Sequence, residues 1–415
     1  MIEKYKMKKN THNNELKTVI SNFGYLSLLQ IAGYVFPIIT MPYLARVIGT
    51  EGFGKISFAS AVIVWFQTIA DWGFNLTATR DVAQNREDKD KVSHIFSNVF
   101  WSRCLLTLIS GCLLLIFIVI VPYFRENAVV ILVTFLIIPG QIMFPDWMFQ
   151  ALEKMKYTTI FNILMKLLFS ISVFVFIHDK EDYIIQPLLN TIGYLMCGIG
   201  SLYLILCKWN YTLYKPKWRE IVMSIKNSTD VFINNIMPNL YNSFSVMLLG
   251  VFGGVRANGL YEGGSKFPTI FYQFQSVLSR AFYPYLSRRQ DKHDIYAKVN
   301  ISAAVVGSIL LMISSPLVIR LFLGDDFTES IIIMQILSIS VIFLAMCYTY
   351  GTNYLIINHR EKPLRTLTAI SSIIGMCISI PLVYYFSYIG ASITVLLCRG
   401  MLGVGSFILA RKYHI

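Results

Sequence analysis

Ten charged residues lie within long apolar stretches of this 415-residue sequence, where ionisable side chains are unexpected. They are Asp71, Arg103, Asp146, Lys166, Lys226, Asp230, Glu262, Lys266, Arg280 and Arg399. A charge at the centre of a membrane helix costs at least about 2.5 to 3.5 kcal/mol, so it normally faces a water-filled cavity or a partner of opposite charge. Because six of the ten are basic and four are acidic, they favour the binding of an anion over the binding of a cation.

Five of the basic residues are predicted to line a cationic, substrate-binding cavity. Arg103, Lys166 and Arg399 lie deep in their apolar stretches and have no acid within reach on the same helix. These three are the strongest candidates, because a deep and unpaired cation needs either water or an anionic ligand. Lys266 and Arg280 complete the predicted set.

Ion pairs within single helices are an alternative for some of these charges. Glu262 and Lys266, like Lys226 and Asp230, are spaced four residues apart, which places each pair on one face of a helix. Lys226 and Arg280 also lie near the ends of their stretches, where a long basic side chain can reach the lipid headgroups. The sequence leaves these interpretations open.

The deep carboxylates are the candidates for ion coupling. They are Asp71, Asp146, Asp230 and Glu262. All six histidines lie in loops, tails or the ends of apolar stretches, so a proton path through the membrane would need these acids. Asp71 and Asp146 have similar depths in the first half of the chain, and each could pair with Arg103 or Lys166 instead of exchanging a proton.

The composition identifies a membrane protein. Apolar residues make up 55% of the chain and charged residues only 14%, against roughly 25% charged in soluble proteins. Runs of roughly 20 apolar residues, bounded by loop signals, predict an all-α fold with twelve transmembrane helices in two six-helix bundles. The spans are placed at 19–47, 55–79, 93–122, 127–150, 157–177, 183–207, 221–252, 257–286, 295–323, 329–357, 364–386 and 388–410.

The basic residues of the loops predict the orientation. The N-terminal tail and the even-numbered loops hold most of them, whereas the odd-numbered loops hold Arg46, Lys55, Arg125, Lys180, Arg256 and Arg320. By the positive-inside rule, both termini are cytoplasmic in a multi-pass membrane protein. Because this topology accounts for the net charge of +13, no nucleic-acid partner is expected.

A weak internal repeat supports two bundles. The sequences GTEGFGKISFAS from Gly49 and GVRANGLYEGGS from Gly254 both contain Gly-x4-Gly before a helix rich in small residues, at an offset of 205. The predicted domains are a basic tail at 1–18, bundles at 19–207 and 221–410, a cytoplasmic linker at 208–220 and a tail at 411–415. Parallel repeats of this kind occur in transporters whose halves surround a central site.

Aromatic residues make up 14% of the chain and include Trp101, Trp147, Tyr241, Tyr272, Tyr283, Tyr348 and Tyr354. Such rings could stack on sugars. Most Tyr and Trp in membrane proteins lie at the two interfaces, so we expect each of these residues to belong to the aromatic belts.

Two motifs in the first half carry a family resemblance. DWGFNLTATRDVA from Asp71 and DWMFQALEKMKY from Asp146, with MPYLARVIGTEGFGKISFA from Met41, resemble the Wzx-type O-antigen and polysaccharide flippases of bacteria. These belong to the multidrug/oligosaccharidyl-lipid/polysaccharide exporter superfamily. The resemblance spans the chain in length and topology, and its motifs are weaker in the second half.

The resemblance implies a V-shaped pair of bundles in the bacterial inner membrane. Its substrate would be an undecaprenyl-diphosphate-linked oligosaccharide, moved from the cytoplasmic to the periplasmic leaflet by alternating access. The family further implies a cationic lumen, a coupling ion (H⁺ or Na⁺), contact with membrane lipids, and a polysaccharide polymerase and chain-length regulator as protein partners. The residues at matched motif positions, placed near a cytoplasmic gate, are Asp71, Asn75, Arg80, Asp146, Gln150, Glu153 and Lys154.

Two other functions compete with this one. A polysaccharide polymerase or glycosyltransferase would need a large extracytoplasmic loop or an acid-rich catalytic motif, and the sequence offers neither. An exporter of small cationic drugs would be expected to have an acidic cavity, which the six basic and four acidic deep charges do not favour. With no G-x-x-x-x-G-K-[ST] motif and no C-x-x-C pair, we expect a transporter without cofactor, metal or direct ATP use.

Overall fold

The computed structural model describes residues 2–413, apart from the side chains of residues 2–23, Leu26, Ser27, Tyr34 and Pro284. The side chains of the predicted N-terminal tail, 1–18, and the last two residues of the predicted tail 411–415 lie outside this description. Within the described chain every regular element is helical and no strand occurs. The predicted all-α fold class is confirmed.

Nine stretches of the described chain are long and apolar enough to cross a membrane. Three of them are far longer than the roughly 20 residues that one crossing needs, namely Leu28–Gln84, Trp218–Arg288 and Glu361–Lys412. Apart from the turn at Trp72 and Gly73 in the first stretch, each contains one residue with non-helical backbone angles: Gly49, Gly254 and Ser387, respectively. Dividing the three stretches there would give twelve segments, so the number of crossings stays a prediction that these breaks favour.

The chain packs as two compact units. The first unit holds Met1–Thr40, Phe66–Ile177 and Ile184–Ile233. Its elements are the ends of α1 (Ile2–Asp71), α2 (Phe74–Gln84), α3 (Lys89–Ile120), α4 (Pro122–Glu126), α5 (Ala128–Phe135), α6 (Ile137–Met143), α7 (Asp146–Ala151), α8 (Met155–Phe176), α9 (Ile185–Tyr203), a π-turn (Leu204–Lys208) and most of α10 (Trp218–Ile236).

The core of the first unit forms around α7. Trp147 is 2% exposed and packs with Phe96 and Phe149 among the fully buried side chains. A tryptophan in an interfacial belt would keep its polar edge at the headgroups, so the belt interpretation is wrong for Trp147. The motif around Asp146 is therefore anchored by its aromatic residues in the core of this unit.

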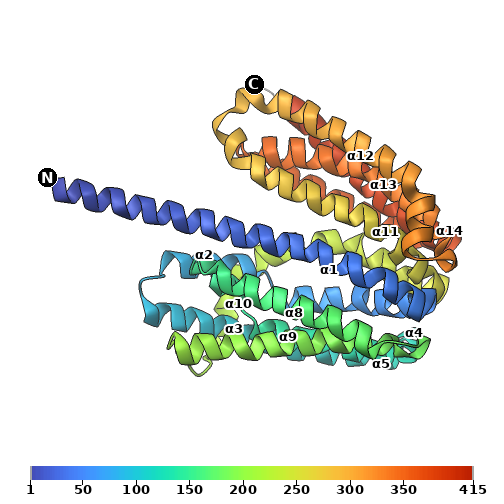
Figure 1. Ribbon diagram of the computed structural model, residues 1–415, viewed down its shortest axis with the longest axis horizontal. Coiled ribbons are helices and arrows are strands. Elements are labelled where there is room, and N and C mark those ends of the chain that lie inside the picture. The colour runs from blue at the N-terminus through green and yellow to red at the C-terminus, as the bar shows by residue number, and fades with distance from the viewer. Residues whose placement is uncertain (1, 414–415) are drawn as a thin grey trace. The chain divides into compact units, whose positions relative to one another are not determined.

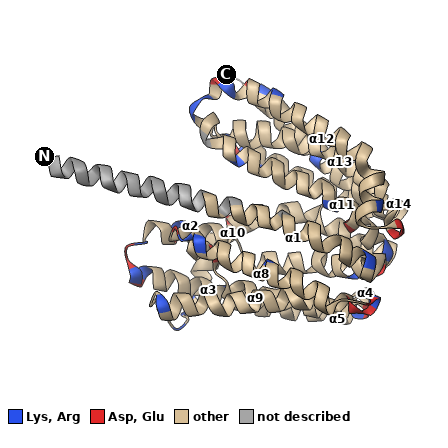
Figure 2. Cartoon of the chain, in the orientation of Figure 1, with Lys and Arg blue, Asp and Glu red and all other residues tan. Residues whose placement is uncertain are grey.

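The second unit holds Met41–Trp65, His178–Tyr183 and Asn234–Ile415. Its elements are the middle of α1, a 3₁₀ turn (Lys180–Ile184, in part), a 3₁₀ turn (Met237–Leu240), α11 (Ser243–Arg288), a 3₁₀ turn (Gln290–Lys292), α12 (His293–Phe322), a 3₁₀ turn (Asp325–Phe327), α13 (Ser330–Met346), a π-helix (Cys347–Ile356) and α14 (Glu361–Lys412). Helices α11, α13 and α14 pack against one another, and α12 packs against α13 (Figure 1). In the described part of each unit, most charged residues lie toward the helix ends (Figure 2).

The repeat found in the sequence has the same backbone form in both copies. Gly49 has φ 64° and ψ −173°, and Gly254 has φ 79° and ψ 178°. Only glycine adopts these angles without a steric penalty, because other residues would place a Cβ against the backbone. Two residues 205 positions apart thus break their helices in the same way, which supports the duplication that the sequence suggested.

The second glycine of each motif lies at a close helix crossing in the second unit. A Cβ added at Gly54 would lie 1.8 Å from the carbonyl oxygen of Val255, and one added at Gly259 would lie 1.9 Å from that of Thr50. The two contacts are equivalent under the offset of 205, because Thr50 and Val255 are themselves matched positions. Small residues allow this approach of two backbones.

Candidate functional site

A cavity of about 220 Å³ lies inside the second unit, bounded by the middle of α1 and by α11, α13 and α14. Its polar lining includes Ser57, Asn242, Tyr261, Glu262, Tyr272 and Arg399. Of the residues predicted from the sequence, the cavity brings together Arg399 and Glu262, which are 137 positions apart in the chain. A deep basic residue and a deep acidic residue therefore share one pocket.

Arg399 is held over an aromatic ring. The centre of its guanidinium lies 3.8 Å from the centroid of the Tyr272 ring, and its Nη1 donates to Ser340 Oγ at 3.1 Å. Tyr272 is itself fixed, because its hydroxyl donates to the carbonyl of Leu337 at 2.9 Å. Within the described chain no carboxylate forms an ion pair with Arg399. Its positive charge is oriented by neutral groups and stays available to a ligand.

Glu262 and Lys266 form an ion pair along α11, which was one of the two interpretations that the sequence left open. Glu262 also accepts a hydrogen bond from Ser57 Oγ at 3.1 Å, which links it to the middle of α1. Because the carboxylate and the ammonium compensate each other, this pair adds polarity to the cavity without a net charge. Lys266 contributes to the predicted cationic set only if its partner is protonated or displaced.

A second polar cluster lies in the first unit, where α1, α3 and α7 meet. Arg103 Nη2 lies 3.4 Å from Asp71 Oδ1, and the two side chains are 8% and 18% exposed. Arg103 also attracts the carboxylate of Asp146, which accepts a hydrogen bond from the Trp147 amide at 2.9 Å. The predicted pairing of Asp71 with Arg103 is present, so the charge of this buried arginine is already compensated.

Lys166 is another deep cation for which the described residues supply no ion pair. Lys166 is half-buried on α8. A Cβ added at Gly33 would lie 3.2 Å from the Lys166 Nζ. The absence of a side chain at Gly33 leaves room for the lysine head within the first unit.

The remaining predicted site residues lie on exposed helix faces. They are Asn75, Arg80, Gln150, Asp230 and Arg280. Arg80 forms an ion pair with Asp81 at 3.0 Å, and Arg280 Nε donates to the Ser276 carbonyl one turn earlier. The structure gathers none of these five at the cavity around Arg399, so their proposed roles rest on the family motif or on their depth alone.

Sequence reasoning missed the aromatic part of the site. Tyr272 was expected in an interfacial belt, and Tyr241 likewise, but both are buried in the second unit, so that interpretation is wrong for them. The available signal was a polar stripe along α11: Tyr261, Ser265, Thr269 and Tyr272 follow one another at about one helical turn and all line the cavity.

Comparison with known families supports the sequence resemblance. Residues 19–290 match the family described as polysaccharide biosynthesis protein. The chain belongs to this family. The matched residues include both the Asp71 and Asp146 motifs and the whole of α11.

Two relatives carry the name putative O-antigen transporter. The protein from Escherichia coli (strain K12) is 26% identical over 383 residues, which cover 90% of this chain and 92% of the relative. The protein from Shigella dysenteriae is 25% identical over 385 residues, covering 90% and 96%. The similarity is thus spread over nearly the whole of each protein.

Solved structures share the fold at low sequence identity. The inward closed conformation of the lipid II flippase MurJ has a TM-score of 0.74 at 12% identity, covering 94% of this chain and 87% of that one. An inward-facing multidrug resistance MATE family transporter of the MOP superfamily has a TM-score of 0.69 at 13% identity, covering 94% and 97%. At such identities the likeness concerns the fold, which is the MATE/MOP-like fold predicted from the sequence.

Proposed function

We propose that this family member is a flippase for undecaprenyl-diphosphate-linked oligosaccharides. It would move O-antigen or capsule repeat units from the cytoplasmic to the periplasmic leaflet of the inner membrane by alternating access. The observation that carries the proposal is Arg399, a cation inside a membrane protein that faces a cavity and has no carboxylate partner in the described chain. The proposal is also supported by the names of similar proteins, two putative O-antigen transporters and the lipid II flippase MurJ.

The geometry at Arg399 suits a diphosphate. A guanidinium offers a planar set of donors that matches phosphate oxygens, and it stacks on aromatic rings as it does here on Tyr272. The surrounding hydroxyl and amide groups of Ser57, Asn242 and Tyr261 can serve the first sugar hydroxyls. We propose that Lys166 in the first unit and Arg280 in the second also contribute cationic contacts to the substrate. Arg103 and Lys266 would do so only when their acidic partners are protonated or displaced.

Ion coupling is the second part of the proposal. Glu262 lines the cavity, forms an ion pair with Lys266 and accepts a hydrogen bond from Ser57. Protonation of the Glu262 carboxylate, or binding of Na⁺ to it, would release Lys266 from this ion pair. The other gate and coupling candidates are Asp71, Asn75, Arg80, Asp146, Gln150 and Asp230. We also propose the bundle boundaries 19–207 and 221–410, the linker 208–220, and cytoplasmic termini.

The test is a deletion of the gene in its host, followed by localisation of lipid-linked repeat units. Accumulation of complete units on the cytoplasmic leaflet is expected, with loss of the surface polysaccharide. Unpolymerised units reaching the periplasm would instead indicate a polymerase. Charge reversal of Arg103, Lys166 and Arg399 together should reproduce the deletion in cells that make the protein at normal levels.

A further inference from the structure

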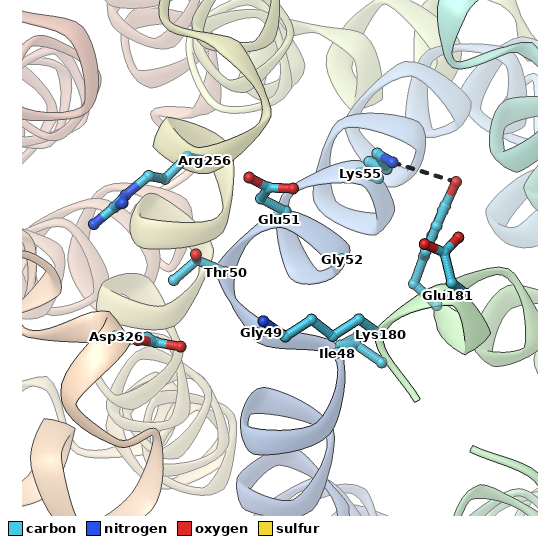
Figure 3. Close-up of a pocket in the computed structure, with 11 residues that line it drawn as sticks. Ile48, Gly49, Thr50, Glu51, Gly52, Lys55, Lys180, Glu181, Arg256 and Asp326 are labelled. Atoms are coloured by element: carbon cyan, nitrogen blue, oxygen red, sulfur yellow. Dashed lines mark hydrogen bonds between the residues drawn. The ribbon is translucent and has the colours of Figure 1, made fainter. Parts of the chain in front are cut away.

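A second cavity of the second unit lies at the connections predicted to face the periplasm. It measures about 310 Å³ and surrounds the turn at Gly49 and Thr50 (Figure 3). Its charged and aromatic lining consists of Glu51, Lys55, Lys180, Glu181, Tyr183, Arg256 and Asp326. These residues come from parts of the chain that are far apart in sequence, so tertiary structure assembles this pocket.

Basic residues are rare on this predicted face, yet they converge here. Lys55, Lys180 and Arg256 all line the pocket, although the odd-numbered loops hold few other Lys or Arg residues. Arg256 Nη2 is paired with Glu329 at 3.1 Å, and Lys55 Nζ lies 4.5 Å from the centroid of the Tyr183 ring. Lys55 also donates to the Tyr183 hydroxyl at 3.5 Å, the contact dashed in Figure 3.

Three carboxylates balance these cations without forming ion pairs with them. Glu51 belongs to α1, Glu181 to the 3₁₀ turn that begins at Lys180, and Asp326 to the 3₁₀ turn Asp325–Phe327. Among the described residues no salt bridge includes any of the three. The pocket therefore presents free acceptors beside oriented donors and one phenol ring.

The geometry points to a carbohydrate-binding site on the release side of the transporter. Sugar hydroxyls are donors and acceptors at once, so they can bond to carboxylates and to ammonium or guanidinium groups in the same pocket. A diphosphate is less favoured here than in the cavity around Arg399, because three carboxylates line this pocket and one of its three cations, Arg256, is already paired with Glu329. The inference rests on the proposed function: the glycan would occupy this pocket after translocation.

Binding to the purified full-length protein tests the inference. The probe is the lipid-free repeat unit, released by mild acid from the host's own lipid-linked intermediates, and binding is followed by saturation-transfer NMR on protein in nanodiscs. The triple variant Glu51→Gln/Glu181→Gln/Asp326→Asn keeps the shape of the pocket but removes its anionic acceptors. We expect its affinity to fall about tenfold or more, since each replaced carboxylate weakens a charge-assisted hydrogen bond.

A matched control changes three exposed acids outside the pocket in the same way. Glu126→Gln/Asp179→Asn/Asp325→Asn should bind the oligosaccharide like the unmodified protein, because none of these residues lines the cavity. Equal binding by the pocket variant, or absence of oligosaccharide binding in the unmodified protein, would overturn the inference. So would inorganic pyrophosphate that competes with the oligosaccharide for this pocket. None of these results bears on the deletion experiment, so the proposed function is tested separately.

Discussion

Two deep arginines, one in each unit, show how differently buried cations can be held. Arg103 in the first unit lies 3.4 Å from Asp71, with both side chains largely buried and Asp146 nearby. Arg399 in the second unit rests on Tyr272, donates to Ser340 and borders a cavity of about 220 Å³. From the sequence, both arginines were predicted to line the cationic cavity, since neither has an acid within reach on its own helix.

The difference indicates a division of roles. A compensated arginine contributes mainly to the packing of α1, α3 and α7, because its charge is already matched within the protein. An arginine supported by neutral groups keeps most of its attraction for an anion. We therefore expect changes at Arg103 and its partner to alter stability first, and changes at Arg399 to alter transport first.

The largest effect is expected from Asp71→Asn. This change leaves Arg103 buried without a full charge partner, and loss of one member of a buried pair typically costs about 3 to 5 kcal/mol. Thermal unfolding of the purified protein in detergent measures the loss. The double variant Asp71→Asn/Arg103→Leu should regain part of it, since the unpaired arginine is removed while Asp146 loses the attraction of Arg103. If the single variant is as stable as the original protein, the structural role given to this pair is wrong.

Arg399→Gln should reduce transport by about ten- to a hundredfold, the value of a charge-assisted hydrogen bond to phosphate. The assay is the amount of surface polysaccharide made by a deletion strain that carries the variant, normalised to protein in the membrane. Lys412→Gln, a neutralisation at the exposed end of α14, is the matched control and should have little effect. Normal polysaccharide from Arg399→Gln would remove the basis of the proposed function.

Tyr272→Leu tests whether the aromatic ring beneath Arg399 matters for transport when the charge of Arg399 is kept. The variant removes the ring beneath the guanidinium, an interaction worth about 0.5 to 2 kcal/mol, so transport should fall several-fold. Tyr272→Phe keeps the ring but loses the hydroxyl that donates to Leu337, and should have the milder effect. If both variants transport equally well, the ring does not position Arg399.

The smallest change in stability is expected from Glu262→Gln. This pair is more exposed than that of Arg103, at 26% for Glu262 and 39% for Lys266, so unfolding should change by less than about 1 kcal/mol. Transport should fall more clearly if Glu262 couples ion binding to movement. The double variant Glu262→Gln/Lys266→Met distinguishes the roles: recovery of transport would show that Glu262 only neutralises Lys266.

Much of the architecture could be predicted because membrane insertion imposes simple rules on sequence. Long apolar stretches indicated an all-α membrane protein. The Gly49 and Gly254 motifs suggested an internal repeat, and the structure adds that the backbone breaks in the same way at both glycines. The four-residue spacing of Glu262 and Lys266 allowed their pairing, because neighbours on one helix face depend only on helix geometry. Spacing alone did not decide it, since Lys226 and Asp230 are spaced alike and form no salt bridge among the described residues.

Contacts between helices could not be read in this way. Which cation meets an acid, as Arg103 meets Asp71, depends on how separate helices pack, and the sequence offered Lys166 as an equal alternative. The same holds for Tyr272 beneath Arg399 and for the convergence of Lys55, Lys180 and Arg256 at one pocket.

The sequence by itself determined which charged residues lie deep in apolar stretches and are energetically costly to bury, since that follows from hydropathy along the chain. Only the tertiary structure decided which of those charges are compensated, because compensation requires atoms distant in sequence to come within a few ångströms.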